Sequence, residues 1–160
     1  MRLRHVVSVA VALCFTTVVS ASPASAAGTP RAQFWMDEGL GGQKLDKDVW
    51  GQGYANIPDL TKEGRGCWLW HCDGNWNDVI SSLRTDGGGQ SPVDLLVFRN
   101  VNYGGTCLYV PKGWTLPRLT LIPAVNQGFR YQITLDNDIS SFKISKDTLT
   151  PPPGCFTFRP

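Results

Sequence analysis

The stretch Asn77-Asp78-Val79-Ile80-Ser81-Ser82 returns 59 residues later as Asp136-Asn137-Asp138-Ile139-Ser140-Ser141. Both copies place two Asn or Asp residues and one variable residue ahead of Ile-Ser-Ser. A second pair of landmarks precedes them. Trp35-x4-Leu40-x-Gly42 opens the first half of the chain, and Phe98-x4-Tyr103-x-Gly105 opens the second half 63 residues later. Two ordered landmarks repeated at nearly the same interval indicate an internal duplication.

The remaining sequence predicts an all-β domain, because short runs rich in aromatic and branched residues alternate with Gly, Pro, Asn and Asp turns. We expect strands at 93–98, 106–110 and 128–135. The last of these leads into the second Asp-Asn loop, and extended structure continues beyond that loop at 141–144. In the first half we expect a strand running from residue 34 into a folded hairpin, and a kinked strand at 49–54. A turn is expected at 56–60, and a loose arm at 28–33. The pattern has no sustained helical period, so at most one helical turn is expected, near 59–62.

The ends of the chain have their own composition. Residues 1–27 combine a charged start, an apolar run and the small residues Ala24-Ser25-Ala26, which is typical of a signal peptide. We therefore expect a secreted, extracellular protein without a membrane span, in which 28–160 form a single domain. Its parts are repeat 1 at about 34–85, a Gly-rich connector at 86–92, repeat 2 at about 93–145 and a Pro-rich tail at 146–160.

Charge and cysteine content narrow the function classes. Loss of Arg2 and Arg4 with the signal leaves 13 Lys and Arg against 13 Asp and Glu, so the mature chain is formally neutral. Such a balance does not favour nucleic acid as a partner. Loss of Cys14 leaves four cysteines, and an even number in an exported chain predicts two disulfides. Of the three connectivities we expect Cys67–Cys72, which is local and flanked by glycine, and Cys107–Cys155, which would anchor the tail.

Together, the repeated landmarks resemble the microbial, calcium-binding form of the βγ-crystallins. In that family the hairpin signature is aromatic-x4-aromatic-x-Gly, and the later loop reads Asn/Asp-Asn/Asp-x-x-Ser/Thr-Ser. The second half matches both parts, whereas the first half departs at Leu40, where the family has an aromatic residue. The resemblance spans about residues 34–145. It implies two Greek-key repeats that form a βγ-crystallin-like sandwich.

The same resemblance implies calcium as a ligand. Calcium prefers several oxygen ligands from carboxylates, amides, hydroxyls and carbonyls. In the family, side chains early in the loop act with a Ser/Thr hydroxyl that reaches across to the site of the opposite repeat. Alternatively, these residues form only Asx and Ser turns that cap the loops. The implied ligands are Asn77, Asp78 and Ser81 in the first copy and Asp136, Asn137 and Ser140 in the second.

A second resemblance concerns Cys67-Trp68-Leu69-Trp70-His71-Cys72, where glycines flank two cysteines five positions apart. It is similar to the short disulfide-closed reactive loop of the actinobacterial metalloproteinase inhibitor family. That similarity implies that the Cys67–Trp68 bond faces the catalytic metal of a secreted, thermolysin-like protease. Trp68 would fill the apolar primed pocket, and Leu69 and Trp70 would extend the contact. Alternatively, the two tryptophans cover an edge of the core under a stapled loop.

Other classes fit the sequence less well. His71 is the one histidine outside the signal segment, so a catalytic triad has only that base, inside a short cysteine loop. Zinc binding by Cys67, His71 and Cys72 is disfavoured, because exported cysteines usually oxidise. We therefore expect a non-enzymatic, monomeric, bacterial peptidase inhibitor of βγ-crystallin type. The alternatives are a calcium-binding structural or stress protein, and a glycan-binding or toxin-like module that uses some of six tryptophans.

Overall fold

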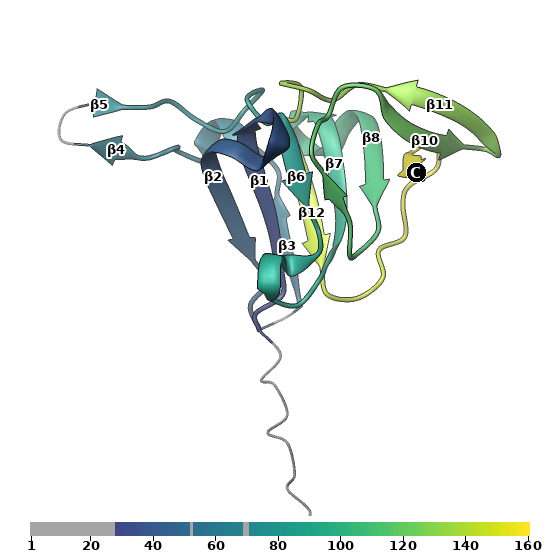
Figure 1. Cartoon of the computed structure of the whole chain (residues 1–160), viewed down its shortest axis with the longest axis horizontal. Coiled ribbons are helices and arrows are strands. Elements are labelled where there is room, and N and C mark those ends of the chain that lie inside the picture. Colours follow the sequence, from purple (N-terminus) through teal and green to yellow (C-terminus); the bar gives the residue numbers. More distant parts are fainter. Residues whose placement is uncertain (1–27, 52, 69–70) are drawn as a thin grey trace, which may run out of the picture.

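A computed structural model describes residues 28–51, 53–68 and 71–160, without the side chains of Cys67, Trp68, His71 and Cys72. In this part of the chain the strands form two larger sheets and one separate two-stranded ladder (Figure 1). Short 3-10 turns are the helical elements here, and none of the described helices is long and apolar enough to cross a membrane. The predicted all-β class is confirmed.

The first sheet has the strand order β2-β1-β6-β9, and the second has the order β11-β10-β13-β8-β7-β12-β3. The strands of the first sheet are β2 (Gly41–Asp48), β1 (Arg31–Asp37), β6 (Ser82–Arg84) and β9 (Thr115–Leu116). Those of the second sheet are β11 (Phe129–Ile133), β10 (Ile122–Asn126), β13 (Phe156–Phe158), β8 (Gly104–Val110), β7 (Asp94–Asn100), β12 (Ser141–Ser145) and β3 (Tyr54–Ile57).

The two repeats exchange one strand each. Repeat 1 places β1, β2 and β6 in the first sheet but sends its third strand, β3, to the edge of the second sheet beside β12. Repeat 2 places β7, β8 and β12 in the second sheet and sends β9 to the first sheet beside β6. Each sheet therefore needs both repeats, and the chain forms a double Greek key, as the resemblance to the βγ-crystallins implies.

Each repeat also carries an extra hairpin between its third and fourth strands. In repeat 1 this hairpin is β4 (Cys67–Trp68) with β5 (His71–Cys72), and in repeat 2 it is β10 with β11. Figure 1 shows the two hairpins reaching outward on opposite sides of the body. The tail returns through β13, which pairs in parallel with β8 and antiparallel with β10. A disulfide joins Cys107 to Cys155, the pair expected from the sequence.

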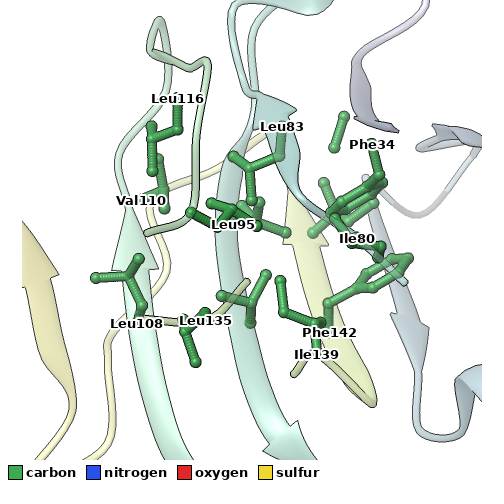
Figure 2. Packing of buried hydrophobic residues seen from close by; sticks show 14 of the residues in the cluster. Phe34, Ile80, Leu83, Leu95, Leu108, Val110, Leu116, Leu135, Ile139 and Phe142 are labelled. Atoms are coloured by element: carbon green, nitrogen blue, oxygen red, sulfur yellow. The ribbon is translucent and has the colours of Figure 1, made fainter. Parts of the chain in front are cut away.

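The core lies between the two sheets and contains the isoleucine of each repeated loop. Ile80 and Ile139 are fully buried, and Phe34 of β1 stacks on Phe142 of β12 with ring centroids 4.5 Å apart (Figure 2). Burial of such side chains contributes about 1.5–3 kcal/mol each. Ile80 and Ile139 hold the same position in the two repeated loops, so each loop places one isoleucine in the core between the sheets.

Several sequence-based expectations for the first half are wrong. Residues 28–33 are not a loose arm, because β1 begins at Arg31 and buries Ala32 and Gln33. The strand expected at 49–54 instead begins at Tyr54, and Ile57, which was assigned to a turn, ends that strand. Pairing with β12 explains the difference, because that partner lies in the other repeat. In the whole described chain, the strands that were not anticipated are β2, β4, β5, β6, β9, β10 and β13.

One smaller expectation holds, and one finding concerns the connector between the repeats. The helical turn near 59–62 is present as η2 (Leu60–Lys62), capped by the Asp59 side chain, which accepts a hydrogen bond from the Thr61 amide at 3.0 Å. The connector at 86–92 includes the 3-10 turn η3 (Gly87–Gly89), where Asp86 accepts a hydrogen bond from the Gly88 amide at 2.8 Å. The connector is therefore a shaped turn rather than an unstructured link.

Candidate metal centre

The second serine of each repeated loop holds the folded hairpin of the same repeat. Ser82 Oγ donates to the Asp37 carbonyl at 2.6 Å and accepts from the Leu40 amide at 3.1 Å. In the second repeat, Ser141 Oγ donates to the Asn100 carbonyl and accepts from the Tyr103 amide at the same two distances, 2.6 and 3.1 Å. The two hairpins are therefore built alike.

Leu40 takes the same backbone shape as its aromatic counterpart. Its φ is 63°, and that of Tyr103 is 62°, both in the left-handed region. The hairpin thus folds without an aromatic residue at position 40, because two other features define its shape. These are the two hydrogen bonds of Ser82, here called the serine clamp together with those of Ser141 in repeat 2, and the glycine two residues after Leu40. Gly42 and Gly105 both have φ of 72°, where a Cβ would lie 2.7 and 2.9 Å from side-chain atoms of Asp37 and Asn100 respectively.

A third repeated landmark was missed from the sequence. Pro58-Asp59-Leu60-Thr61 returns as Pro117-Arg118-Leu119-Thr120, again 59 residues later. Each proline carbonyl accepts a hydrogen bond at 2.6 Å from the folded hairpin of the other repeat, donated by Asn102 and Gly39 respectively. A search for Pro-x-Leu-Thr at the interval of the Asp-Asn loops would have found this landmark.

The repeated loops meet each other across the boundary between repeats. Ser140 Oγ donates to Asp78 Oδ1 at 3.1 Å, and Ser81 Oγ donates to Asn137 Oδ1 at 3.3 Å. The backbones follow the same exchange. The Asp78 amide donates to the Ile139 carbonyl, and the Asn137 amide donates to the Ile80 carbonyl, at 3.2 and 3.0 Å. The structure thus brings all six predicted ligands together as two oxygen clusters: Asn77, Asp78 and Ser140 in the first cluster, and Asp136, Asn137 and Ser81 in the second.

One oxygen in each cluster stands without a partner. Asn77 Oδ1 and Asp136 Oδ1 are buried, and neither accepts a hydrogen bond within the described part of the chain. Buried polar atoms are normally satisfied by protein, water or an ion. Asn77 and Asp136 hold the same position in the two loops, so the unmet oxygen is a repeated feature.

The turn alternative explains other features of these loops. Asp78 and Asn137 both have φ of 52°, a conformation that Asp and Asn tolerate better than most residues. Asp138 pairs with Arg99 through a 2.5 Å contact between carboxylate oxygen and Nε, so it serves structure. Loop shape accounts for these residues, but it provides no partner for Asn77 Oδ1 or Asp136 Oδ1.

The oxygen donors of each cluster suit a hard cation, although each cluster carries only one negative charge. Among the described residues, no three His, Cys, Asp or Glu side chains converge on one point. Each cluster instead combines one carboxylate with an amide and a hydroxyl. Calcium accepts such mixed oxygen ligands together with backbone carbonyls, whereas zinc prefers nitrogen and sulfur. The residues present therefore fit calcium, held by few charges.

The predicted inhibitory loop is only partly described. Leu69 and Trp70 lie outside the described residues, as do the side chains of Cys67, Trp68 and Cys72, so the Cys67–Cys72 disulfide stays a prediction. The backbone of β4 and β5 pairs Cys67 with Cys72 and Trp68 with His71. Below them the two arms remain paired, with the Arg65 amide donating to the Gly74 carbonyl at 3.1 Å and Gly64 bridging to Asn75.

The tryptophans outside this loop divide between core and surface. Trp35 and Trp76 are buried, at 7% and 2% exposure, so they belong to the packed interior. Trp50 is 69% exposed and Trp114 39% exposed, with Trp114 packed edge-on against Phe158 at 5.2 Å between centroids. Among these four, only Trp50 offers a largely free ring for stacking on a sugar.

The similarity of this chain to known proteins is a similarity of fold. No protein-family model and no curated protein matches the chain. A beta gamma crystallin from Ciona intestinalis shares 19% identity, covering 70% of this chain and 95% of its own length, with a TM-score of 0.44. A structure concerning the evolution of the eye lens beta-gamma-crystallin domain fold shares 13% identity over 79% of this chain and 92% of its own, with a TM-score of 0.43.

A third solved structure is a nickel complex of a clostrillin double mutant. It shares 19% identity, covers 73% of this chain and 99% of its own length, and has a TM-score of 0.41. At this level of similarity, the ligands and partners of those proteins say nothing about those of this chain.

Proposed function

We propose that this protein is a secreted, non-enzymatic, calcium-binding module with two sites, one in each oxygen cluster between the repeats. The observation that carries the proposal is the pair of buried, partnerless oxygens, Asn77 Oδ1 and Asp136 Oδ1, at equivalent positions of the two loops. A cation bound in each cluster would satisfy the oxygen of that cluster. The repetition matters, because a single orphan oxygen occurs in many structures by chance, whereas a matched pair follows the duplicated sequence.

Calcium would link the two repeats, because each cluster contains residues of both. Asn77 and Asp78 belong to repeat 1, while Ser140, which contacts Asp78, belongs to repeat 2, and the second cluster reverses this relation. Since the unfolded chain cannot assemble ligands 62 residues apart, binding favours the folded state. At a calcium concentration of about 100 times Kd, one site adds roughly 2.7 kcal/mol.

The test compares thermal unfolding in calcium and in chelator for the wild type and Asp136→Ala. The variant should lose about half of the calcium-dependent rise in Tm, because one of two sites is lost. In chelator its Tm should match or exceed that of the wild type, since removing an unsatisfied buried oxygen removes a cost of about 1–3 kcal/mol.

A matched control lies two residues away. Asp138→Ala removes a carboxylate from the same loop, but this carboxylate pairs with Arg99 and lies outside both clusters. We expect it to leave the calcium-dependent rise in Tm unchanged. Equal melting temperatures of the wild type in calcium and in chelator would disprove calcium binding, and the loops would then serve only as turns.

A second candidate function is protease inhibition by the β4–β5 hairpin. The observation that favours it is the shape of this hairpin, which projects from the body as a separate ladder with Cys67 opposite Cys72 (Figure 1). A hairpin of this kind, closed by a disulfide, would present a preformed segment to a protease and lose little entropy on binding. Trp68 would be its anchor in the apolar pocket of a thermolysin-like metalloprotease.

Inhibition assays test this candidate directly. Trp68→Ala should weaken inhibition of a thermolysin-like protease by at least about thirty-fold, the effect of losing a large anchor worth ~2 kcal/mol. Trp50→Ala is the matched control, because Trp50 is 69% exposed and lies in another loop. Equal inhibition constants for the two variants, or no inhibition by the wild type, would reject the candidate.

A further inference from the structure

The charges of the chain separate in the fold. Segments 113–135 and 148–160, here called the basic segments, contain Arg118, Arg130 and Arg159 but no Asp or Glu. The other residues from 28 onward carry ten Lys and Arg against 13 Asp and Glu. The neutral total thus conceals a side-chain charge of +3 on the basic segments and −3 on the rest of the domain.

The arginines of the basic segments also differ in their contacts. Elsewhere among the described residues, Arg31, Arg84 and Arg99 each form an ion pair with a carboxylate, whereas Arg65 is half-buried and contacts Met36 Sδ instead. Within the described residues, Arg118, Arg130 and Arg159 form none, and all three are exposed. Exposed guanidinium groups that form no ion pair remain available to an anionic ligand.

Two of these arginines border one cavity. It has a volume of 580 Å³ and lies along β10, β11 and the end of the tail. Cavities of this size hold small organic ligands. No Asp or Glu is among the described residues that line it, which are Pro123, Ala124, Val125, Arg130, Tyr131, Gln132, Arg159 and Pro160.

The strand register explains why the polar groups of this cavity share a face. Val125 of β10 lies opposite Arg130 of β11 on one side and opposite Thr157 of β13 on the other. Pro123 lies opposite Gln132, and its carbonyl accepts a hydrogen bond from the Arg159 amide at 3.2 Å. Successive side chains of a strand point to opposite faces of the sheet, so directly opposite residues and residues two apart share a face. Arg130 and Gln132 therefore lie on the same face as Val125 and Pro123, and Arg159, two residues after Thr157, lies on that face as well.

We propose that this cavity binds an oxyanion carried by a sugar-sized molecule, such as a sugar phosphate or a uronic acid. Arg130 and Arg159 would hold the phosphate or carboxylate group, since guanidinium groups bind both in a forked geometry. The Gln132 amide would donate to a hydroxyl group. Pro123 and Val125 provide an apolar floor for the carbon skeleton. This site lies outside the oxygen clusters and does not depend on calcium.

Calorimetric titration with glucose 6-phosphate, glucuronic acid and glucose tests the proposal on the whole secreted domain. Saturable binding of at least one charged sugar, without binding of glucose, is expected. Arg130→Gln and Arg159→Gln should each raise its Kd about tenfold, the effect of losing one charge-assisted contact. The charged sugar that binds more tightly identifies phosphate or carboxylate as the preferred group.

Arg118→Gln is the matched control, because it removes the same charge from the same basic segments but does not line the cavity. It should change Kd by less than about twofold. An effect as large as that of Arg130→Gln would overturn the proposal in favour of general attraction between charges. Binding of phosphatidylglycerol vesicles without binding of either charged sugar would overturn it in favour of a membrane surface, and no binding at all would overturn it outright.

Discussion

Two buried hydroxyls, Ser82 Oγ and Ser141 Oγ, each satisfy one backbone amide and one carbonyl of a folded hairpin. Alanine at either position would leave both backbone groups without this partner in a site of 0% exposure. We expect each substitution to lower the free energy of unfolding by about 2–4 kcal/mol, given a cost of about 1–3 kcal/mol for each unsatisfied group. Urea unfolding measures this loss.

Ser91→Ala provides the comparison. Its hydroxyl donates to the Gly28 carbonyl at 2.8 Å in a partly exposed position, where water can replace it. A loss of under about 1 kcal/mol is therefore expected. If Ser82→Ala and Ser141→Ala cost no more than Ser91→Ala, the clamp does not stabilise the hairpins.

At the residue scale, the resemblance to the βγ-crystallins implied that each serine reaches the loop of the opposite repeat, but nothing in the sequence showed which atoms would lack a hydrogen bond. The six oxygen-bearing residues of the clusters were recognisable because both copies keep them in order, and their interval is set by the duplication. The partnerless oxygens of Asn77 and Asp136 were not predictable, because burial of a single atom depends on packing between repeats. Likewise, a leucine at position 40 gave no sign that its backbone would match that of Tyr103.

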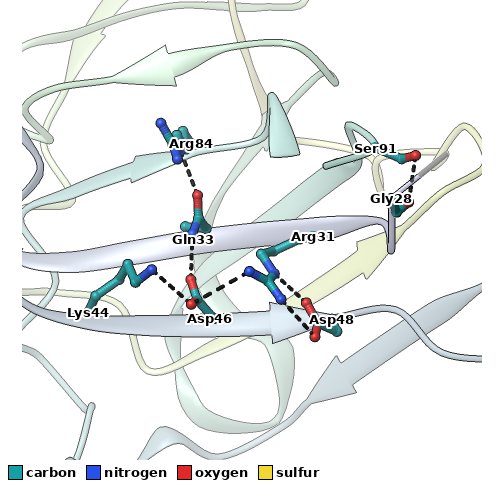
Figure 3. A network of polar contacts seen from close by, with 8 residues as sticks. All are labelled: Gly28, Arg31, Gln33, Lys44, Asp46, Asp48, Arg84 and Ser91. Carbon is teal, nitrogen blue, oxygen red and sulfur yellow. Dashed lines mark hydrogen bonds and ion pairs between the residues drawn. The ribbon is translucent and has the colours of Figure 1, made fainter. Parts of the chain in front are cut away.

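A row of polar residues crosses three strands of the first sheet. Arg84 of β6 donates to Gln33 of β1 at 2.6 Å, and Gln33 donates to Asp46 of β2 at the same distance (Figure 3). The register places these residues directly opposite one another. Lys44 and Arg31 also approach Asp46, at 2.9 and 3.8 Å. The row therefore fixes the alignment of β1 between its neighbours.

This row makes the first sheet sensitive to acid. Burial raises the pKa of the Asp46 carboxyl, but hydrogen bonds from Lys44 and Gln33 and the charge of Arg31 outweigh burial and hold the pKa below its ordinary value of 3.8. The folded state thus binds this proton more weakly than the unfolded state. The ionised Asp46 carboxylate therefore stabilises the folded state at pH values above the ordinary pKa of 3.8, and this stabilisation is lost as the pH falls through the pKa of the folded state.

Asp46→Asn should flatten that dependence. Between about pH 5 and about pH 2, the variant should lose less unfolding free energy than the wild type, by up to about 1 kcal/mol for a partly exposed pair. Urea unfolding at several pH values measures the difference. Asp147→Asn, at an exposed position, serves as the control, and an identical pH dependence for Asp46→Asn and wild type would contradict the role of Asp46.

At the element scale, strands were predictable where the run is rich in branched and aromatic residues, as in β7, β8 and β11. The strands β2, which is polar, and β10, which contains a proline, were missed although each pairs with a strand next to it in the sequence. The beginning of β1 was missed because Arg31 and Gln33 read as a polar arm, and their partners in β2 and β6 lie 13 to 51 residues away. The exchange of β3 and β9 was also hidden. Each of these strands is short, and its partner belongs to the other repeat.

At the scale of the whole molecule, one disulfide governs how the β10–β11 hairpin is attached. The strand order β11-β10-β13-β8 makes β13 the link between this hairpin and the body. Cys155 directly precedes β13, and Cys107 lies in β8, where both pack with Leu96 and Phe98 on the outer face of the second sheet. The tail therefore covers that face and, through β13, links the β10–β11 hairpin and its cavity to β8.

Removing this bond should loosen one region rather than the whole domain. Cys155→Ala opens a loop between cysteines 48 residues apart, which corresponds to about 4 kcal/mol of chain entropy in the unfolded state. Because β13, β10 and β11 attach in series, their amides should lose protection first in hydrogen exchange, while those of β1, β2 and β6 keep theirs. Mass spectrometry of peptic fragments distinguishes these regions. Uniform loss of protection in both sheets would show that the tail is part of a single cooperative core, and unchanged protection of 122–133 would show that pairing alone holds the hairpin.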